Sequence, residues 1–494
     1  MIKTPILIVG AGPTGLMLSA QLHRYGAPHR IIEKKPGITE LSKALGVQAR
    51  TLEFYRQLGL TDRALGQGFV GRSVRFIING KVRAAVQLGE IGANLSPYPY
   101  LFILEQSLNE ALLFDHITAK GGDVDWATEV AALHKTADGY GGNLLRGDGA
   151  SDPFECQYLV GCGGASSPVR HFLDMPFPGG TNEQSFFVAD IVMEVEFDKH
   201  GLLLVINDDE FFAFFPMAGA NQYRAIGVLP SSISDLDDVP FDQLQDHIET
   251  NIGMPIKITG SSWHSSYRVH HRLADNFQSG HAFLAGDAAH IHSPAGGQGM
   301  NTGLGDAVNL GWKLAAVVNG WADPDILKSY NEERRPFGVQ LVNTTDRAFA
   351  MMVSKHRLPR LIRTHVFPLV FSTVLRLEPL RRLMFKTISQ IRINYRKSPL
   401  SDGSRSKSLQ SGDRFPWFEW EGGNSFEWMS SIGFVVLRFG GVPSPEIPSW
   451  RGPIKEIEVD GKAAEAAVKA GLPASGTVIV RPDMHLMQLS PNNA

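Results

Sequence analysis

The sequence predicts an α/β fold that combines a parallel sheet with a separate antiparallel sheet. Residues 6–32 read strand, glycine turn, helix and strand, which is the order of a βαβ unit. Residues 283–313 also read as a short apolar strand followed by a glycine loop and a helix. Between about residues 183 and 263, runs such as FFVADIVMEVEF and FFAFFPM suggest antiparallel strands. Such a sheet could form the floor of a substrate pocket, or could be ordinary core.

The N-terminal element contains GAGPTG at residues 10–15, which is the pattern G-x-G-x-x-G between a strand and a helix. In that context Gly10 permits the tight turn, Gly12 lets the backbone approach a pyrophosphate, and Gly15 lets helix and strand pack closely. Glu33 lies about twenty residues further on, where an acid hydrogen-bonds the adenosine ribose. The pattern predicts a Rossmann-like dinucleotide-binding domain and does not choose between NAD and FAD.

The second element lies at residues 283–313. Its apolar strand ends at Gly286 and Asp287, and an acidic group at a strand end suits a polyol hydroxyl. The proline and glycine loop from 294 to 299 then opens a helix. The first backbone N–H groups of such a helix are free to face an anionic ring or a phosphate.

Length and composition limit the class of protein. At 494 residues the chain exceeds one ordinary core, so two or three domains are expected. A hydrophobic content of 43% with 20% charged residues is typical of a soluble globular protein, and a net charge of -3 gives no reason to expect nucleic acid. We expect no membrane span and no secretion signal, because neither a long apolar run nor a signal-peptide pattern is present.

The two cysteines, Cys156 and Cys162, lie in one strand-like run. At a rise of about 3.3 Å per residue they are roughly 20 Å apart, which is beyond disulfide reach. A reducing, cytoplasmic location is therefore expected.

Three motifs together carry a resemblance to a known family. GAGPTG at 10–15, YLVGCGGASSPVR at 158–170 and GDAAHIHSPAGGQGMN at 286–301 resemble the class A FAD-dependent aromatic hydroxylases. The branch is that of the phenol hydroxylases and the polyketide and phenylpropionate hydroxylases, and the likeness runs from residue 3 to about residue 400. It implies FAD as cofactor, NADPH or NADH as co-substrate, and hydroxylation of a small aromatic substrate by O2 through a flavin C4a-hydroperoxide.

The resemblance also implies site residues. Asp287 would bind the flavin ribitol, the loop from Pro294 to Met300 would lie against the isoalloxazine, Gln106 would contact the FAD chain, and Lys43 would lie near the pyrophosphate. The full predicted cofactor site comprises Gly10, Gly12, Pro13, Thr14, Gly15, Glu33, Lys43, Gln106, Gly286, Asp287, Pro294, Gly297, Gly299, Met300 and Asn301.

Two residues are candidates for a catalytic role, Pro294 and Tyr267. Tyr267 matches a tyrosine that phenol-hydroxylase relatives use beside the substrate hydroxyl, and an anchored core tyrosine is the alternative. We predict no metal site, because His290 and His292 belong to the flavin motif and no carboxylate or cysteine set stands at ligand spacing.

One position departs from the family pattern. The central motif normally carries an aspartate where this chain has Gly163, while Ser167 and Arg170 fit. That aspartate helps to seat FAD and is linked to the use of pyridine nucleotide. Two alternatives therefore stay open, a flavoprotein of another oxidoreductase type and a flavin-binding scaffold with impaired NAD(P)H use.

The predicted domains follow from the resemblance and from composition. Residues 1–175 and 264–397 would form a discontinuous FAD-binding domain, and 176–263 with roughly 74–104 an inserted antiparallel substrate sheet. Serine and glycine at 398–412 suggest a linker, and 413–494 resembles a shortened thioredoxin-like domain that lacks cysteines, with a packing or homodimer role.

Residues 355–397 are strongly basic, with eleven Lys and Arg against the single acid Glu378. We interpret this segment as a solvated helix face or a subunit interface, with attachment to a membrane surface as the alternative.

Overall fold

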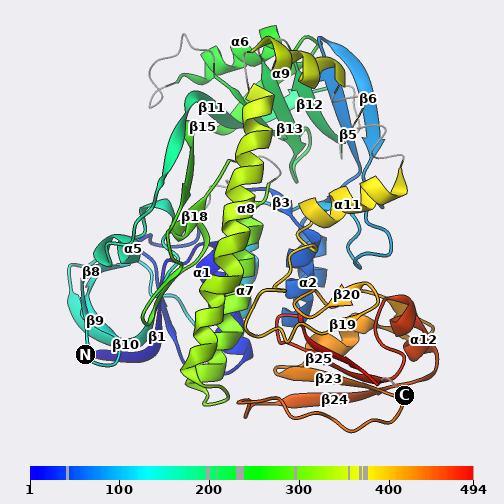
Figure 1. Ribbon diagram of the computed structural model, residues 1–494. Coiled ribbons are helices and arrows are strands. Elements are labelled where there is room, and N and C mark those ends of the chain that lie inside the picture. Colours follow the sequence, from blue (N-terminus) through cyan, green and yellow to red (C-terminus); the bar gives the residue numbers. More distant parts are fainter. Residues whose placement is uncertain are drawn as a thin grey trace.

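The computed structural model describes residues 1–39, 44–195, 201–207, 210–229, 239–293, 297–353, 356–366, 370 and 377–492 (Figure 1). Its sheets and helices form a mixed α/β fold, as the sequence predicts. Lys43 and Pro294, both predicted site residues, lie outside the described residues.

The first sheet has seven strands, and its central strands are parallel and apolar on both faces, as is typical of parallel strands that are buried on both sides. Ile6, Leu7 and Ile8 have no exposed surface at all. The strands run in the order β16-β17-β10-β1-β2, with β9 and β8 added through β10. Their bounds are β1 Ile2–Val9, β2 Arg30–Ile32, β8 Thr128–Lys135, β9 Tyr140–Arg146, β10 Ser151–Gly161, β16 Gln278–Ser279 and β17 Ala282–Leu284.

Helices α1 and α7 pack together against this sheet (Figure 1). They follow β1 and β17, so each predicted nucleotide element has the expected strand and helix. The helices of this part are α1 Pro13–Arg24, α2 Ala49–Leu58, α3 Thr61–Gln67, α4 Gln106–Ala119, α5 Pro168–Phe172 and α7 Gly299–Val318.

The second sheet has eight strands in the order β18-β15-β11-β14-β13-β12-β5-β6, antiparallel except between β12 and β5. A hairpin turns at Asn79 and Gly80, with φ of 48° and 73°, as an Asn-Gly pair between two strand-like runs predicts. The strands are β5 Ser73–Ile78, β6 Lys81–Gln87, β11 Gly179–Glu194, β12 Gly201–Ile206, β13 Phe211–Pro216, β14 Gln222–Val228, β15 Lys257–Leu273 and β18 His290–Ile291.

The two faces of this sheet differ. Phe187 and Ala189 of β11 pack with Leu244 and Ile248 of α6 (Phe241–Asn251), which covers the outer face. Because successive strand residues point to opposite faces, Phe186, Val188 and Asp190 lie on the inner face. That face looks toward the first sheet (Figure 1). A small sheet of β3 Gly46–Val47, β4 Phe69–Gly71 and β7 Leu101–Ile103 completes this part of the chain.

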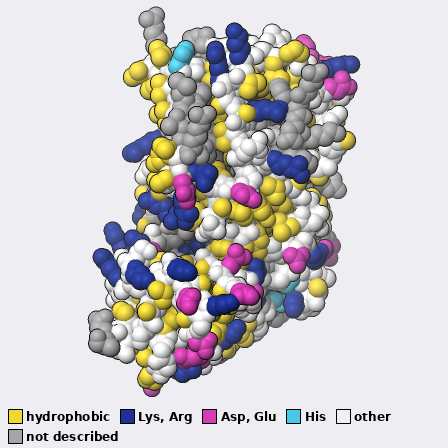
Figure 2. Space-filling view, turned by 90° about the vertical axis from the view of Figure 1, so that its right-hand side faces the viewer, with side chains coloured by type: hydrophobic (Ala, Val, Ile, Leu, Met, Phe, Trp, Pro, Cys, Tyr) yellow, Lys and Arg dark blue, Asp and Glu magenta, His cyan; other side chains and the backbone are white. Residues whose placement is uncertain are grey.

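A long helix, α8 (Lys328–Val353), runs along both sheets (Figure 1). The basic segment continues through α9 (Arg357–Leu361), a short π-helix (Ile362–Val366) and α11 (Glu378–Ile388). On α11, Leu380 and Leu383 are exposed beside Arg382 and Lys386, and Figure 2 shows hydrophobic and basic side chains intermixed on the face that carries α11. Among the described residues, no helix is both long and apolar enough to cross a bilayer.

The C-terminal sheet has four strands in the order β24-β23-β25-β26, with β23 and β24 parallel and α12 between β24 and β25 in the chain. The bounds are β23 Phe434–Phe439, β24 Ile454–Val459, α12 Gly461–Lys469, β25 Gly476–Val480 and β26 Leu486–Pro491. Residues 398–412, predicted as a linker, carry the short hairpin β19 (Arg405–Ser406) and β20 (Leu409–Gln410). Ser398 and Ser411 are buried there, so this segment packs against its neighbours.

Candidate FAD and substrate site

The glycine turn after β1 is held by backbone contacts. Gly10 has φ of 111°, a left-handed conformation that favours glycine, and a Cβ there would lie 2.6 Å from the carbonyl carbon of Cys162. A Cβ on Gly15 would lie 1.9 Å from the carbonyl oxygen of Gly10. A Cβ on Gly12 would meet nothing within 4 Å. The space beside Gly12 is therefore open, which fits a bound pyrophosphate.

Glu33 lies beside this turn at the end of β2. Its carboxylate accepts hydrogen bonds from the backbone N–H groups of Ala11 at 2.8 Å and Lys35 at 3.1 Å. The structure thus brings together the acid and the glycine turn that the sequence pairs.

The two nucleotide elements meet through Thr14. A Cβ placed on Gly286 would lie 2.5 Å from Thr14 Oγ1, and one on Gly303 would lie 2.3 Å from the same oxygen. Asp287 itself is exposed at the end of β17. Segments almost 300 residues apart therefore pack directly against each other, as a single FAD site requires.

The start of α7 is fixed by Asn301. Its side-chain oxygen accepts the backbone N–H of Gln48 at 2.8 Å, and its side-chain nitrogen donates to the carbonyls of Gly46 at 2.9 Å and Gly297 at 3.0 Å. The side chain of this predicted cofactor residue is thus engaged within the protein. It holds the described end of the glycine loop against residues 46–48.

Gln106, at the start of α4, is similarly engaged. Its side-chain oxygen accepts the backbone N–H of Ala44 at 3.2 Å, and its nitrogen donates to Glu110 at 2.9 Å. Gln106 therefore lies next to the segment that carries Gly46, and residues 44–48, the predicted contact Gln106 and the predicted contacts within 297–301 come together in space.

Asp306 organises the turn between β17 and α7. It is buried and accepts hydrogen bonds from Gly286 N at 3.0 Å, His290 Nε2 at 2.7 Å and Arg334 Nε at 2.6 Å. Burial alone would raise the pKa of Asp306, but Arg334 and His290 lower it below its usual range. Asp306 thus remains ionised and shapes the loop that presents Asp287.

Comparison with known proteins decides the family. The chain matches the model of the FAD binding domain family over residues 3–345. It is 31% identical over 404 residues to 6-methylpretetramide 4-monooxygenase of Streptomyces rimosus, covering 81% of this chain and 71% of that protein. It is 30% identical over 486 residues to rifampicin monooxygenase of Rhodococcus hoagii, covering 97% and 94%. The chain belongs to the FAD-dependent aromatic hydroxylases.

The fold agrees with this family. Anhydrotetracycline hydroxylase from Streptomyces rimosus superposes on this hydroxylase with a TM-score of 0.78 at 28% sequence identity, covering 99% of this chain and 96% of that one. The predicted family, the FAD cofactor and the activity of a monooxygenase acting on an aromatic compound are thereby confirmed. NAD(P)H is the usual co-substrate of such enzymes.

The departing motif at Gly163 still contacts the second element of this hydroxylase. Arg170, held in the same turn, donates to the carbonyl oxygens of Ala288 at 3.1 Å and Ala165 at 2.5 Å. Ser167 caps α5 by accepting the N–H of Arg170 at 3.4 Å. Arg170 therefore connects the two motifs although the family aspartate is replaced.

Restoring the aspartate, Gly163→Asp, is expected to speed flavin reduction by NAD(P)H on the order of tenfold, about 1.4 kcal/mol in the barrier. The backbone φ of -77° is open to aspartate, and an added Cβ would lie 3.2 Å from Pro168 Cδ, so that the proline ring must shift by a few tenths of an ångström. Anaerobic stopped-flow reduction measures the rate, and Gly163→Asn is the uncharged control. An unchanged rate with Gly163→Asp would mean that the departure is harmless.

Tyr267 lies on β15, directly opposite Phe186 of β11, on the inner face of the second sheet. The two ring centroids are 6.2 Å apart. Burial raises the pKa of Tyr267 to about 12, partly offset by the nearby charge of Arg224. The phenol therefore keeps its proton at neutral pH and can donate or accept a hydrogen bond.

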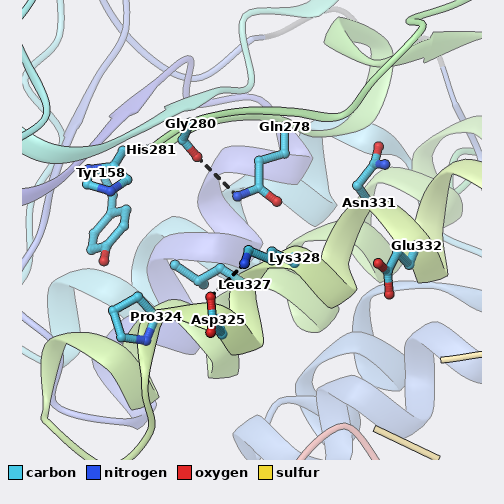
Figure 3. Close-up of a pocket in the computed structure, with 10 residues that line it drawn as sticks. All are labelled: Tyr158, Gln278, Gly280, His281, Pro324, Asp325, Leu327, Lys328, Asn331 and Glu332. Atoms are coloured by element: carbon cyan, nitrogen blue, oxygen red, sulfur yellow. Dashed lines mark hydrogen bonds and ion pairs between the residues drawn. The ribbon is translucent and has the colours of Figure 1, made fainter. Parts of the chain in front are cut away.

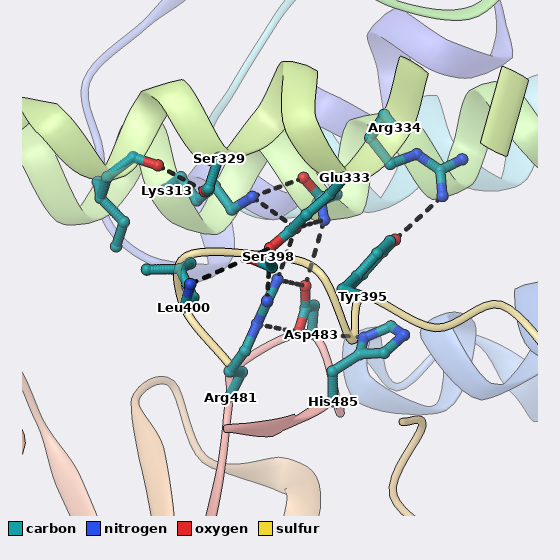
Figure 4. Close-up of polar contacts among 12 residues, drawn as sticks. Lys313, Ser329, Glu333, Arg334, Tyr395, Ser398, Leu400, Arg481, Asp483 and His485 are labelled. Carbon is teal, nitrogen blue, oxygen red and sulfur yellow. Dashed lines mark hydrogen bonds and ion pairs between the residues drawn. The ribbon is translucent and has the colours of Figure 1, made fainter. Parts of the chain in front are cut away.

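A buried network of charges joins the FAD part to the C-terminal part (Figure 4). Arg481 donates to Glu333 at 2.7 and 2.9 Å and to Asp483 at 2.6 and 3.1 Å, and Lys313 donates to Glu333 at 2.7 Å. Burial alone would raise the pKa of Glu333, but Arg481 and Lys313 lower it below its usual range. Arg334 donates to Asp306 at 2.6 Å and to the Tyr395 hydroxyl at 3.0 Å, and the Tyr395 ring centroid lies 5.2 Å from the Arg481 guanidinium carbon.

The sequence did not reveal this network, because Glu333 and Arg481 are 148 positions apart. One signal was present, a lysine within the otherwise apolar helical run NLGWKLAAVV. A lysine in such a run is rarely buried without a partner.

The loss of Asp306 tests the role of these charges. Asp306→Asn is expected to destabilise the protein by about 3–5 kcal/mol at pH 7, because Arg334 loses its buried counter-charge. Since folding lowers the pKa of Asp306, its stabilising contribution is present above the unfolded value of about 3.9 and is lost as pH falls below it. Urea unfolding midpoints from pH 7 to pH 3 should therefore fall less steeply in the variant, whereas Asp115→Asn, in an exposed ion pair, should match the wild type.

A separate cavity of about 530 Å³ lies at the start of β17 (Figure 3). Its lining includes Tyr158, His281, Asp325, Lys328 and Glu332. None of the predicted site residues lines it, because it lies at the opposite end of the parallel strands from the glycine turn.

Proposed function

We propose that this hydroxylase acts on a fused, polyketide-like aromatic compound held between the inner face of the eight-stranded sheet and the start of α7. The observation that carries the proposal is the contrast between the two faces of β13. Phe212 and Phe214, on the outer face, are fully buried, whereas Phe211 and Phe215, on the inner face, are only partly covered. Aromatic surface left uncovered on an inward-looking face suits a flat aromatic ligand.

The inner face is connected to the flavin motif by short backbone contacts. Leu104 N–H donates to the carbonyl of Leu45 at 2.8 Å, and Gly46 lies against Gly297, with 4.0 Å from its ideal Cβ to that carbonyl. Glu105, which follows Leu104 in the chain, accepts a hydrogen bond from the backbone of Ala218, two residues after the end of β13. A substrate on this face would therefore lie beside the loop that opens α7.

The relatives act on substrates of this kind by name, 6-methylpretetramide, rifampicin and anhydrotetracycline. A single-ring phenol is the second candidate. It is supported by pentachlorophenol 4-monooxygenase of Sphingobium chlorophenolicum, which is 32% identical over 349 residues, covering 69% of this chain and 63% of that protein.

The residues present fit FAD, because the space at Gly12 is open, Asp287 is exposed, and the contact of Thr14 with Gly286 brings the two elements together. Gly10 to Gly15 and Glu33 would hold the adenosine and pyrophosphate part, and Asp287 with residues 297–301 the ribitol and ring. Bound FAD supplies the activation of O2. The inner sheet face orients the aromatic ring and excludes water.

Tyr267 would hold the substrate hydroxyl by a hydrogen bond. Burial raises the pKa of Tyr267 to about 12, so its phenol stays neutral. It can accept a hydrogen bond from the substrate hydroxyl, or donate one to the substrate oxygen when that oxygen is ionised. An anchored core tyrosine is the alternative, and Tyr267→Phe separates the two, since only the substrate role predicts a loss of turnover without a loss of stability.

The finer organisation follows the same proposal. The sheet of residues 176–263 with roughly 74–104 would be the substrate domain, and 413–494 a thioredoxin-like domain that serves packing. Lys43, Pro294, a homodimer and a cytoplasmic location remain predictions.

The test is aerobic oxidation of NADPH and NADH by the FAD-loaded enzyme with anhydrotetracycline, rifampicin, 1-naphthol and phenol. The fused compounds should stimulate oxidation most and gain one oxygen atom by mass spectrometry. Stimulation by phenol alone would overturn the proposed substrate class. No stimulation by any of the four would favour a scaffold with impaired NAD(P)H use.

A further inference from the structure

We propose that Arg224 is the specificity residue of this site, and that it donates a hydrogen bond to a neutral carbonyl oxygen attached to the aromatic ring of the substrate. This inference rests on the proposed function and adds the chemical group that the substrate must carry.

Arg224 is held rigidly by one partner. It lies on β14 directly opposite Asp190 of β11, and its Nε and Nη2 donate to the two carboxylate oxygens at 2.7 and 2.6 Å. The side chain of Arg224 is 1% exposed and that of Asp190 is 13% exposed. A two-pronged pair of this kind fixes the plane and direction of the guanidinium.

The third guanidinium nitrogen of Arg224, Nη1, does not bind Asp190. A guanidinium has five N–H donors, and Nη1 carries two of them. Nη1 is buried and has no hydrogen-bond partner in the part of the chain that the structure describes. Buried donors are nearly always paired, so an unpaired one on an inward face points to an acceptor supplied by a ligand.

The surroundings place this donor at the substrate position. Trp263 lies opposite Asp190 on the neighbouring strand, with its ring centroid 5.8 Å from the Arg224 guanidinium carbon. Tyr267 lies on the same strand and face, close enough for the charge of Arg224 to affect its pKa. The donor thus lies near Trp263 and near Tyr267, the residue proposed to hold the substrate hydroxyl.

The charges favour a neutral acceptor over an anion. Asp190 already balances the positive charge of Arg224, and Glu105 adds a second carboxylate nearby, since both Arg224 and Asp190 influence its pKa. A substrate carboxylate beside Arg224 would be attracted by one positive charge and repelled by the carboxylates of Asp190 and Glu105. A ring carbonyl can accept from Nη1 without that repulsion.

Three probes on one scaffold test the inference. They are 1-naphthol, which has no added acceptor, 2-acetyl-1-naphthol, which adds a neutral carbonyl, and 1-hydroxy-2-naphthoate, which adds a carboxylate. Dissociation constants are measured from the change in flavin absorbance of the FAD-loaded enzyme. We expect the acetyl compound to bind at least tenfold more tightly than 1-naphthol, and the carboxylate to bind more weakly than the acetyl compound.

The variants separate recognition from folding. Arg224→Met leaves Asp190 unpaired, so the double variant Arg224→Met with Asp190→Asn, which removes both charges, is measured beside it. Both should lose the preference for the acetyl compound, which is measured in each variant as the ratio of the dissociation constants of 1-naphthol and the acetyl compound. Arg83→Met, an exposed arginine on β6 of the same sheet, should keep the preference.

The outcomes are distinguishable from failure of the proposed function. If 1-naphthol is bound or hydroxylated but the wild type shows no preference for the acetyl compound, only the role of Arg224 is overturned. A carboxylate that binds most tightly overturns the neutral acceptor. If none of the three probes alters the flavin spectrum or NAD(P)H oxidation, and anhydrotetracycline and rifampicin also fail to stimulate oxidation, the proposed function itself is wrong.

Discussion

Gly12→Ala is expected to weaken FAD binding about tenfold or more, at least about 1.4 kcal/mol, while leaving the stability of the apoprotein unchanged. The protein itself has room for the methyl group, since nothing lies within 4 Å of an added Cβ. The backbone is extended, with φ of -72° and ψ of -175°, which alanine adopts freely. The methyl group would instead occupy the space beside the glycine turn, at the start of α1, where the pyrophosphate must approach.

The measurement is FAD titration of the apoprotein by fluorescence, together with its thermal unfolding. Gly66→Ala, at another open glycine in α3, is the matched control and should bind FAD normally. Gly15→Ala should destabilise the apoprotein, because the added Cβ would lie 1.9 Å from a backbone oxygen. Wild-type FAD affinity in Gly12→Ala would show that the cofactor does not approach this turn.

Arg481→Met is expected to lower the free energy of unfolding by about 3–5 kcal/mol. Glu333 and Asp483 would remain buried with their principal counter-charge removed, since Arg481 binds both and has no exposed side-chain surface. Lys313 would still face Glu333, so the loss stops short of leaving that carboxylate alone.

Urea unfolding at pH 7 measures this loss. Arg451→Met is the control, because its ion pair with Asp323 lies at the surface with both side chains more than half exposed, and such pairs contribute about 0–1 kcal/mol. Arg481→Lys should fall between the wild type and Arg481→Met, since it keeps the charge and loses the forked contact. Equal stability of Arg481→Met and the wild type would mean that the buried charges do not hold the two parts together.

The sequence predicted best what short stretches of chain determine. The glycine turn, the acid at Glu33 and the hairpin at Asn79 each depend on residues within one βαβ unit or one turn, so their patterns are local. The pairing of residues 10–15 with 286–301 was also predicted, but through resemblance to a family rather than from spacing.

The rest depends on contacts between distant segments. The pair of Arg224 and Asp190 follows from the register of β14 against β11, and a slip of one residue would turn either side chain to the other face. Asn301 reads as a cofactor contact in sequence, yet its amide is used to hold residues 46 and 48. The serine and glycine content of residues 398–412 suggested a linker. Composition alone does not show that Ser398 donates a hydrogen bond to Glu333, a contact between distant segments.

The charges that join the C-terminal part to the rest also decide how chimeras of these enzymes should be designed. Arg414 pairs with Glu53 of α2, and Arg481 pairs with Glu333 of α8, so each side of the boundary holds half of a buried pair. A C-terminal part transplanted from a relative without matching arginines would remove one buried counter-charge from each carboxylate, leaving Glu53 to Arg50 and Glu333 to Lys313. The exchangeable unit is therefore the C-terminal part together with positions 53 and 333, and an exchange that ignores these two positions would yield a less stable protein whatever its active site contains.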